Sequence, residues 1–252
     1  MLKIFRSIRK DQIRSRNARL YLLYAIGEII LVVLGILIAL QVNNWNEDRK
    51  QNNKRDILVE NLISDFESTL SNIHSTKRMA DQLLDDMNLF YEIQHYGMRV
   101  SVDSLKKLAL SFFRLIPFQA SLSSYEQAEY TGELGLLKKR ELFVSINEFK
   151  STYRTIEELQ TISLQSYFSG SAWDFRKTIG SVYQIVDASF LPLDISPPME
   201  LALPEYLRLL NTPIAAAAFE NSYLILVNYL NGLQSLEEST EDILEILKTD
   251  DN

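Results

Sequence analysis

An acidic residue lies inside the longest apolar run of the sequence, where a charge is costly. Between residues 20 and 42 the only charged side chain is Glu28. A carboxylate costs on the order of 2.5–3.5 kcal/mol at the centre of a bilayer, and less nearer its flank. Three roles are open for Glu28. It forms a contact between copies, in which the small residues Gly27, Gly35 and Ala39 let helices approach closely. Alternatively, its carboxyl reaches back to the headgroups, or it is a step in a proton or cation pathway.

The rest of the sequence offers few groups for catalysis or metal binding. Cysteine is absent, and histidine occurs only as His74 and His95. Glu92 and His95 have the Glu-x-x-His spacing of di-iron bundles, but Ser71 replaces the glutamate before His74. We therefore interpret this pair as a solvated helix end. Phosphate-binding loops, HExxH and EF-hand patterns are also absent, so we expect no enzyme, no cofactor and no metal site.

The apolar run predicts a transmembrane helix with a defined orientation. Its 23 residues extend roughly 34 Å as a helix, which is enough to cross a bilayer. Residues 1–19 carry a net charge of +6, whereas residues 43–252 carry −12. Because basic flanks stay in the cytoplasm, we expect a cytoplasmic leader at 1–19, a membrane helix at 20–42 and an extracytoplasmic domain at 43–252. The negative charge of this domain and the isolation of its basic clusters argue against nucleic-acid binding.

Two alternatives concern this N-terminal region. A cleaved signal peptide has an apolar region of about 7–15 residues that ends at a small-x-small site, whereas this run is longer and ends without one. We therefore expect an uncleaved anchor. The leader forms either a short amphipathic helix, with Leu2, Phe5 and Ile8 on one side, or a disordered basic tail. Both forms are attracted to an anionic inner leaflet.

The sequence after residue 45 has the pattern of long helices and no alternating strand pattern. Residues 46–96 contain neither glycine nor proline. We expect them to continue the membrane helix and to end before Gly97. Their apolar residues form two rows with a spacing of seven, which together make one seam. The rows are Val59, Phe66, Ile73, Ala80 and Met87, and Ile63, Leu70, Leu84 and Tyr91, with Lys77 in the gap.

Two further long helices are expected. The second begins near Leu142 and ends at residues 169–171, or resumes after them as far as Gly180. The third begins with Thr212 as its N-cap and Pro213 in its first turn. Its rows are Phe219, Leu226, Leu233 and Leu247, and Tyr223, Leu230 and Leu244.

Shorter helices are expected near residues 103–114 and from residue 123 or 124 to residue 131. Three long helices and these short ones predict an all-α fold, with an antiparallel helical bundle outside the membrane.

Residues 187–204 depart from the helical pattern, because four prolines alternate there with apolar side chains. Two interpretations stay open. The segment is a docking surface for a partner, presented by Phe190, Leu191, Leu193 and Ile195, or it folds back and closes one end of the bundle.

Residues 24–50, YAIGEIILVVLGILIALQVNNWNEDRK, resemble the N-terminal signature of an uncharacterised single-pass membrane family of Bacteroidota. Weaker similarity continues along the chain, where residues 125–137 resemble a Tyr-x6-Gly-x-Leu-x-Leu segment of that family. The resemblance implies an inner-membrane protein with a helical extracytoplasmic domain. It implies no activity, ligand or catalytic residue.

These observations predict a non-enzymatic, single-pass protein of a bacterial inner membrane. Its N-terminus is cytoplasmic, and its periplasmic helical domain acts as a scaffold or interaction module. We expect a homo-oligomer, with an unidentified membrane or periplasmic protein as a further partner. The alternative is a proton- or ion-coupled membrane subunit that uses Glu28. A small-molecule sensor or enzyme with a pocket between the long helices is the third hypothesis.

Overall fold

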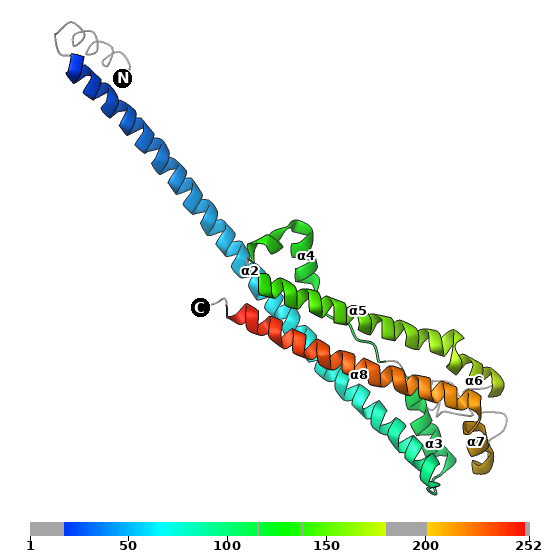
Figure 1. Cartoon of the computed structure of the whole chain (residues 1–252). Coiled ribbons are helices and arrows are strands. Elements are labelled where there is room, and N and C mark those ends of the chain that lie inside the picture. Colours follow the sequence, from blue (N-terminus) through cyan, green and yellow to red (C-terminus); the bar gives the residue numbers. More distant parts are fainter. Residues whose placement is uncertain (1–17, 115, 138, 180–200, 250–252) are drawn as a thin grey trace, which may run out of the picture. The chain divides into compact units, whose positions relative to one another are not determined.

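The computed structural model describes residues 18–114, 116–137, 139–179 and 201–249. Every regular element within these ranges is a helix, which confirms the predicted all-α class. In chain order (Figure 1) the elements are α2 (Ala18–Tyr96), α3 (Val102–Ala109), η1 (Leu110–Phe113), α4 (Ser123–Thr131), η2 (Glu133–Leu136), α5 (Arg140–Ser169), α6 (Ser171–Ile179), α7 (Leu203–Leu210) and α8 (Pro213–Lys248).

The chain forms two compact units, Met1–Ile57 and Leu58–Asn252. The described part of the first unit is the N-terminal part of α2. The second unit contains the rest of α2, the other described helices and the buried core.

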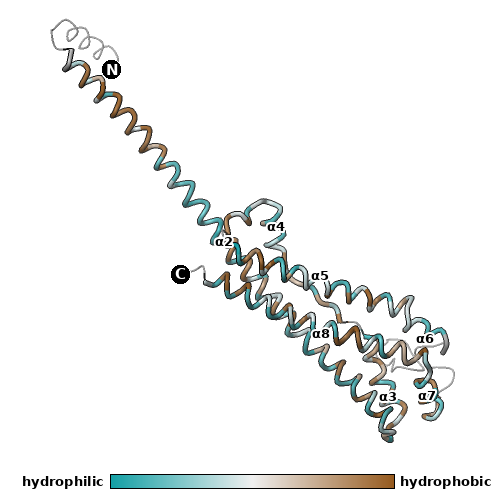
Figure 2. Tube along the Cα trace, in the orientation of Figure 1, coloured by the Kyte–Doolittle hydropathy of each residue, from teal (hydrophilic) through white to brown (hydrophobic). Residues whose placement is uncertain are grey.

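In the first unit, α2 changes from apolar to polar along its length, as Figure 2 shows. The leucine, isoleucine and valine side chains between Leu22 and Val42 are exposed, and Leu31 reaches 74%. By length and composition this helix can cross a membrane, and its most apolar window contains no buried residue. This unit therefore exposes apolar surface on all sides of one helix.

In the second unit, both predicted rows of α2 face the core. The first row is buried and the second is partly buried against it. A third row, which the sequence analysis did not identify, lies beside them with the same spacing of seven. It consists of Leu62, Thr69, Thr76, Leu83 and Phe90, all buried.

Helix α8 likewise buries its first predicted row. In the second, Leu244 is buried, and Tyr223 and Leu230 are partly buried against the core; a third row lies beside them. Thr240 is fully buried in the gap of the first predicted row, where its hydroxyl donates to Leu236 O (2.6 Å). The third row contains Ala215, Tyr229, Leu236 and Ile243, which are buried, and Ser222, which is partly exposed.

Helices α2 and α8 run in opposite directions along the second unit. Lys248 Nζ lies 2.7 Å from Glu67 Oε1, and Tyr223 donates its hydroxyl to Asn88 Oδ1 (3.0 Å). Residue numbers therefore rise along α2 as they fall along α8.

Helix α5 packs along α8, also in the opposite direction. Gly232 lies beside Ile156, and a Cβ added there would come within 3.2 Å of the Ile156 side chain. Toward the other end of the pair, Asn221 donates to Ser166 Oγ (3.1 Å). Gly232 thus allows the close approach of these two helices.

Charged residues fill facing gaps in the rows of α2 and α8. Lys77 forms an ion pair with Glu237, and their side chains are only 22% and 16% exposed. His74 Nε2 lies 2.8 Å from Glu237 Oε1. The hydrogen bond from Lys77 is the main reason that the pKa of Glu237 falls below its usual 4.5; burial opposes this shift, and the Lys77 charge and His74 reinforce it.

The helix ends agree with several signals in the sequence. Helix α2 ends before Gly97, which has a φ of 63°, a left-handed conformation that glycine adopts without strain. Thr212 caps α8 by accepting a hydrogen bond from Ala215 N (3.3 Å), and Pro213 occupies the first turn. Both predictions are confirmed.

Two segments differ from the expected elements. The helix expected at 103–114 is α-helical only to Ala109 and continues as the 3-10 helix η1. Helix α7 was not expected, since its first residues belong to the predicted 187–204 loop. Pro204 lies in the first turn of α7, where a missing N–H costs nothing, and Glu205 accepts from Ala202 N (3.2 Å). The sequence pattern had placed this proline in the loop predicted at residues 187–204.

The Glu237 ion pair predicts a pH-dependent loss of stability. A lowered carboxyl pKa contributes stability above the ordinary pKa of about 4.5, and that contribution is lost as the pH falls through the lowered value. At pH 7, Glu237→Gln should reduce the free energy of unfolding by about 1 kcal/mol. The difference from wild type should shrink toward zero in denaturant titrations at successively lower pH. The exposed Glu241→Gln is the control, and an equal, pH-independent loss in both variants would contradict the prediction.

Candidate functional site

The residues predicted for an intramembrane contact lie on the exposed surface of α2. Glu28, Gly35 and Ala39 share one face, because steps of seven and eleven residues return a helix to nearly the same direction. Gly27 is also exposed, about a quarter-turn away. A Cβ added at Gly27 or Gly35 meets no atom of the described residues within 4 Å. This face therefore has room for a neighbouring helix.

The two histidines occupy polar positions on α2. His74 is half exposed and paired with Glu237, and His95 lies exposed at the end of the helix with its ring against Tyr96. Glu92 is exposed as well. In the described ranges, no group of three or more His, Cys, Asp or Glu side chains is placed to hold a metal ion.

The predicted docking residues Phe190, Leu191, Leu193 and Ile195 lie outside the described residues. Whether the 187–204 segment presents a docking surface or closes one end of the domain therefore stays a prediction.

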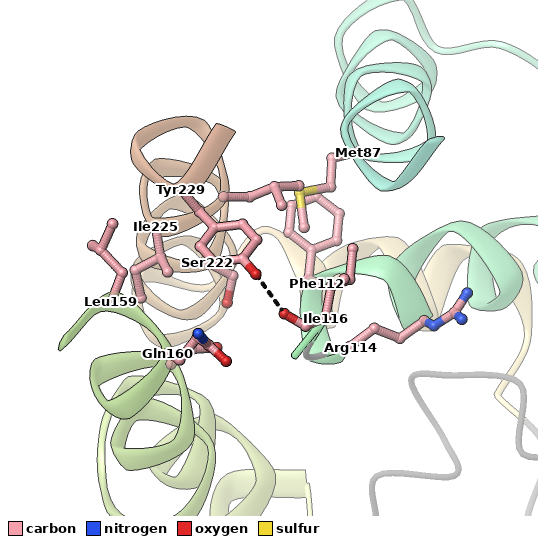
Figure 3. A pocket seen from close by; sticks show the side chains of 11 residues that line it. Met87, Phe112, Arg114, Ile116, Leu159, Gln160, Ser222, Ile225 and Tyr229 are labelled. Carbon is pink, nitrogen blue, oxygen red and sulfur yellow. Dashed lines mark hydrogen bonds between the residues drawn. The ribbon is translucent and has the colours of Figure 1, made fainter. Parts of the chain in front are cut away.

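A small cavity of about 40 Å³ opens between the second-unit part of α2, the segment after η1, α5 and α8. Figure 3 shows Met87 from α2, Phe112 from η1, Leu159 from α5 and Ile225 from α8 around it. Arg114 is its charged lining residue within the described part of the chain. The cavity is therefore mainly apolar, with a cation at its rim.

Two side chains fix the chain at this cavity. Tyr229 donates its hydroxyl to Ile116 O (2.9 Å), as the dashed line in Figure 3 shows. Burial and the nearby Tyr153 raise the pKa of Tyr229, so this phenol stays protonated and can donate. Gln160 accepts from Phe118 N and donates to Phe118 O, both at 3.2 Å. These bonds hold the irregular segment after η1 against α5 and α8.

A larger cavity of about 180 Å³ adjoins the first. It extends toward the C-terminal end of α5, where Tyr167, Phe168 and Ala172 contribute to its wall. The residues that line both cavities are Phe112, Arg114, Ser163, Ser222 and Ile225. The two cavities therefore lie next to each other on the second unit, and together they are called the hollow.

Aromatic rings pack densely behind this hollow. The ring of Phe219 lies 5.2 Å from Phe90 and 4.6 Å from Phe112, measured between centroids. Tyr91 packs edge-on against Phe112, and its hydroxyl is buried without a hydrogen bond to any described residue. Burial, then the nearby Glu220 and Tyr223, raise the pKa of Tyr91 to about 12. The buried Tyr91 hydroxyl therefore lowers the stability of an otherwise well-packed aromatic cluster.

Arg114, Ser163 and Ser222 were not predicted from the sequence as site residues. The sequence did contain one signal for Ser222, because this residue is the small polar member of a row on α8 whose members are seven residues apart. No comparable signal marks Arg114, whose position depends on where η1 ends.

Comparison with known protein families finds a match. Residues 28–112, about a third of the chain, match a family of unknown function (DUF6090). The matched region begins at Glu28, covers most of α2 and ends in η1. No curated protein and no solved structure matches the chain. The expected likeness to an uncharacterised family is thus confirmed, while its bacterial group and detailed signature stay predictions.

Two tyrosine-to-phenylalanine substitutions should have opposite effects. Tyr91→Phe removes a buried hydroxyl that lacks a partner among the described residues, so the free energy of unfolding should rise by about 1 kcal/mol. Tyr229→Phe removes an existing hydrogen bond and leaves Ile116 O without its donor, so the free energy of unfolding should fall by about 1 kcal/mol. Urea denaturation of the two variants and wild type measures both changes. Equal destabilisation by both would show that the Tyr91 hydroxyl is satisfied.

Proposed function

We propose that this chain is a single-pass protein of a bacterial inner membrane, with a cytoplasmic N-terminus and a periplasmic C-terminal domain. The observation that carries the proposal is the apolar stretch of α2, which is exposed on all its sides. Exposed apolar surface of this extent is unfavourable in water and is satisfied by lipid. The basic residues of 1–19 support the orientation, because an anionic inner leaflet attracts them.

The periplasmic domain acts as a non-catalytic scaffold or interaction module. A core that extends along α2, α5 and α8 supports this role, because such an antiparallel bundle is stiff enough to present fixed surfaces. The partner is an unidentified membrane or periplasmic protein.

Copies of the chain associate through the α2 face that carries Glu28, Gly35 and Ala39. Small residues allow two helices to approach closely, and a protonated carboxyl can donate a hydrogen bond to its counterpart across the contact. The space around Gly35 within one chain supports this view, because nothing from the described residues covers it.

A second candidate is a proton- or ion-coupled subunit. It is favoured by one observation: Glu28 is the only charged residue in the apolar stretch. Acidic residues within a membrane often mark pathways for protons or cations.

Membrane topology provides the first test. In bacterial cells, the full-length chain should stay in the membrane fraction after alkaline carbonate extraction. A C-terminal epitope should be cleaved by protease added to spheroplasts, because the domain lies outside the cytoplasm. An N-terminal epitope on the same chain is the internal control and should stay protected. Protection of both epitopes, or release by carbonate, would contradict the proposed topology.

Substitution of Gly35 tests association. A Cβ added at Gly35 meets no atom of the described residues within 4 Å, so loss of the oligomer in Gly35→Leu measures a contact between copies. We expect its dimer dissociation constant in detergent to rise at least tenfold, measured by analytical ultracentrifugation. Leu37→Ile, an apolar change on the opposite side of the same helix, is the control.

Glu28→Gln separates the two candidate functions. An amide still forms hydrogen bonds between helices but cannot exchange a proton, so scaffold association should be retained. If the wild-type protein carries protons into liposomes and this variant does not, the ion-coupled subunit is favoured instead. A strictly monomeric wild-type protein would overturn the association proposal.

A further inference from the structure

The larger cavity has the size and the lining of a site for one aromatic ring. Its volume of about 180 Å³ slightly exceeds that of an engineered apolar cavity of roughly 150 Å³ that binds benzene. Phe112, Phe113, Tyr167 and Phe168 contribute to its wall. Aromatic rings favour edge-on or offset contacts with such neighbours. An aryl group therefore fits this cavity in both volume and contact chemistry.

Most polar groups in the wall already have partners. Ser222 donates to Ala218 O (3.0 Å), and Ser166 Oγ accepts from Asn221 (3.1 Å). Gln160 is occupied at both ends by Phe118. These groups shape the cavity but have little capacity left to bind a ligand.

Ser163 and Arg114 are different, and both line the two adjoining cavities. Neither has a hydrogen bond or an ion pair with another residue in the described part of the chain. Ser163 is partly buried on α5, and Arg114 is exposed at the end of η1. Among the described residues, one hydroxyl and one guanidinium on the same wall are thus without a partner.

The charge of the rim selects the head group of a ligand. Among the described residues that line either cavity, Arg114 carries the only charge, and no carboxylate is present to repel an anion. A guanidinium binds a carboxylate through two parallel hydrogen bonds, and a serine hydroxyl can donate a third. The rim therefore fits a carboxylate better than a neutral or cationic group.

We propose that this hollow binds a small aryl carboxylate, with its ring in the larger cavity and its carboxylate at Arg114 and Ser163. In Figure 3 the guanidinium of Arg114 points away from Gln160, so binding requires this exposed side chain to turn over the rim. Exposed side chains change rotamer within picoseconds to nanoseconds, so this motion is fast. The site lies wholly within the second unit and goes beyond the proposed scaffold function.

Three probes that share the same apolar part and differ in their polar head group test the proposal: 3-phenylpropionate, 3-phenylpropan-1-ol and 3-phenylpropylamine. The full-length chain in zwitterionic nanodiscs is titrated with each by calorimetry, with empty nanodiscs as the blank. The carboxylate should bind at least tenfold more tightly than the alcohol, because hydrogen bonds to charged groups are stronger than neutral ones. The amine should bind most weakly.

Two variants locate the site. Arg114→Gln should remove the tenfold preference for the carboxylate and leave the affinity for the alcohol unchanged. Arg154→Gln makes the same charge change at an exposed position of α5 that lines neither cavity, and should change nothing. Ser163→Leu should weaken all three probes, because its side chain fills the space common to both cavities; circular dichroism confirms that it is folded.

The outcomes separate clearly. Equal affinity for the three probes, no binding of any probe, or the same loss from Arg154→Gln as from Arg114→Gln would each overturn the proposal. None of these results bears on membrane insertion or on association through α2, which are tested with other residues.

Discussion

The second unit depends on the register between α2 and α8. Each helix has three rows with a spacing of seven, and burial of one large apolar side chain contributes about 1.5–3 kcal/mol. This apolar contact stabilises the pair but distinguishes registers poorly, because a slide by seven residues matches similar rows again. Such a slide would place Lys77 against Leu230 or Leu244 instead of Glu237. Since an unpaired, half-buried charge is costly, the Lys77–Glu237 pair favours the observed register.

The sequence predicted the parts of this arrangement that local patterns determine. Seven-residue spacing located the seams, and Gly97 and Thr212 located helix ends, because backbone conformation and capping are decided by neighbouring residues. The third row of α2 was missed because Thr69 and Thr76 look polar. The fold satisfies Thr69 through a residue 52 positions away: its hydroxyl accepts from Ser121 N (2.9 Å). No local pattern reveals such a partner.

The two adjoining cavities follow from the same rows. Near the N-terminal end of α8, Ser163 and Ser166 of α5 face Ser222 of α8. Small side chains therefore occupy positions that hold leucine, tyrosine or isoleucine elsewhere along these helices. The large rings of Phe112 and Phe113 border the resulting space without filling it. The sequence shows each small residue separately, but only the packing of the helices brings them together. The candidate ligand site was therefore beyond sequence reasoning, unlike the Glu28 face of α2.

The two parts of α2 differ in the solvent for which their sequence is suited. Between residues 58 and 96 apolar side chains repeat along one side of the helix, and the opposite side is charged, which suits a protein core facing water. Between residues 20 and 42 apolar side chains cover every side, and none of the most apolar window is buried by the rest of the chain. In water that surface would drive aggregation, whereas in lipid it needs no protein partner. Glu28 is the one charged residue in that stretch of sequence, so it marks the position at which lipid alone is an unfavourable environment.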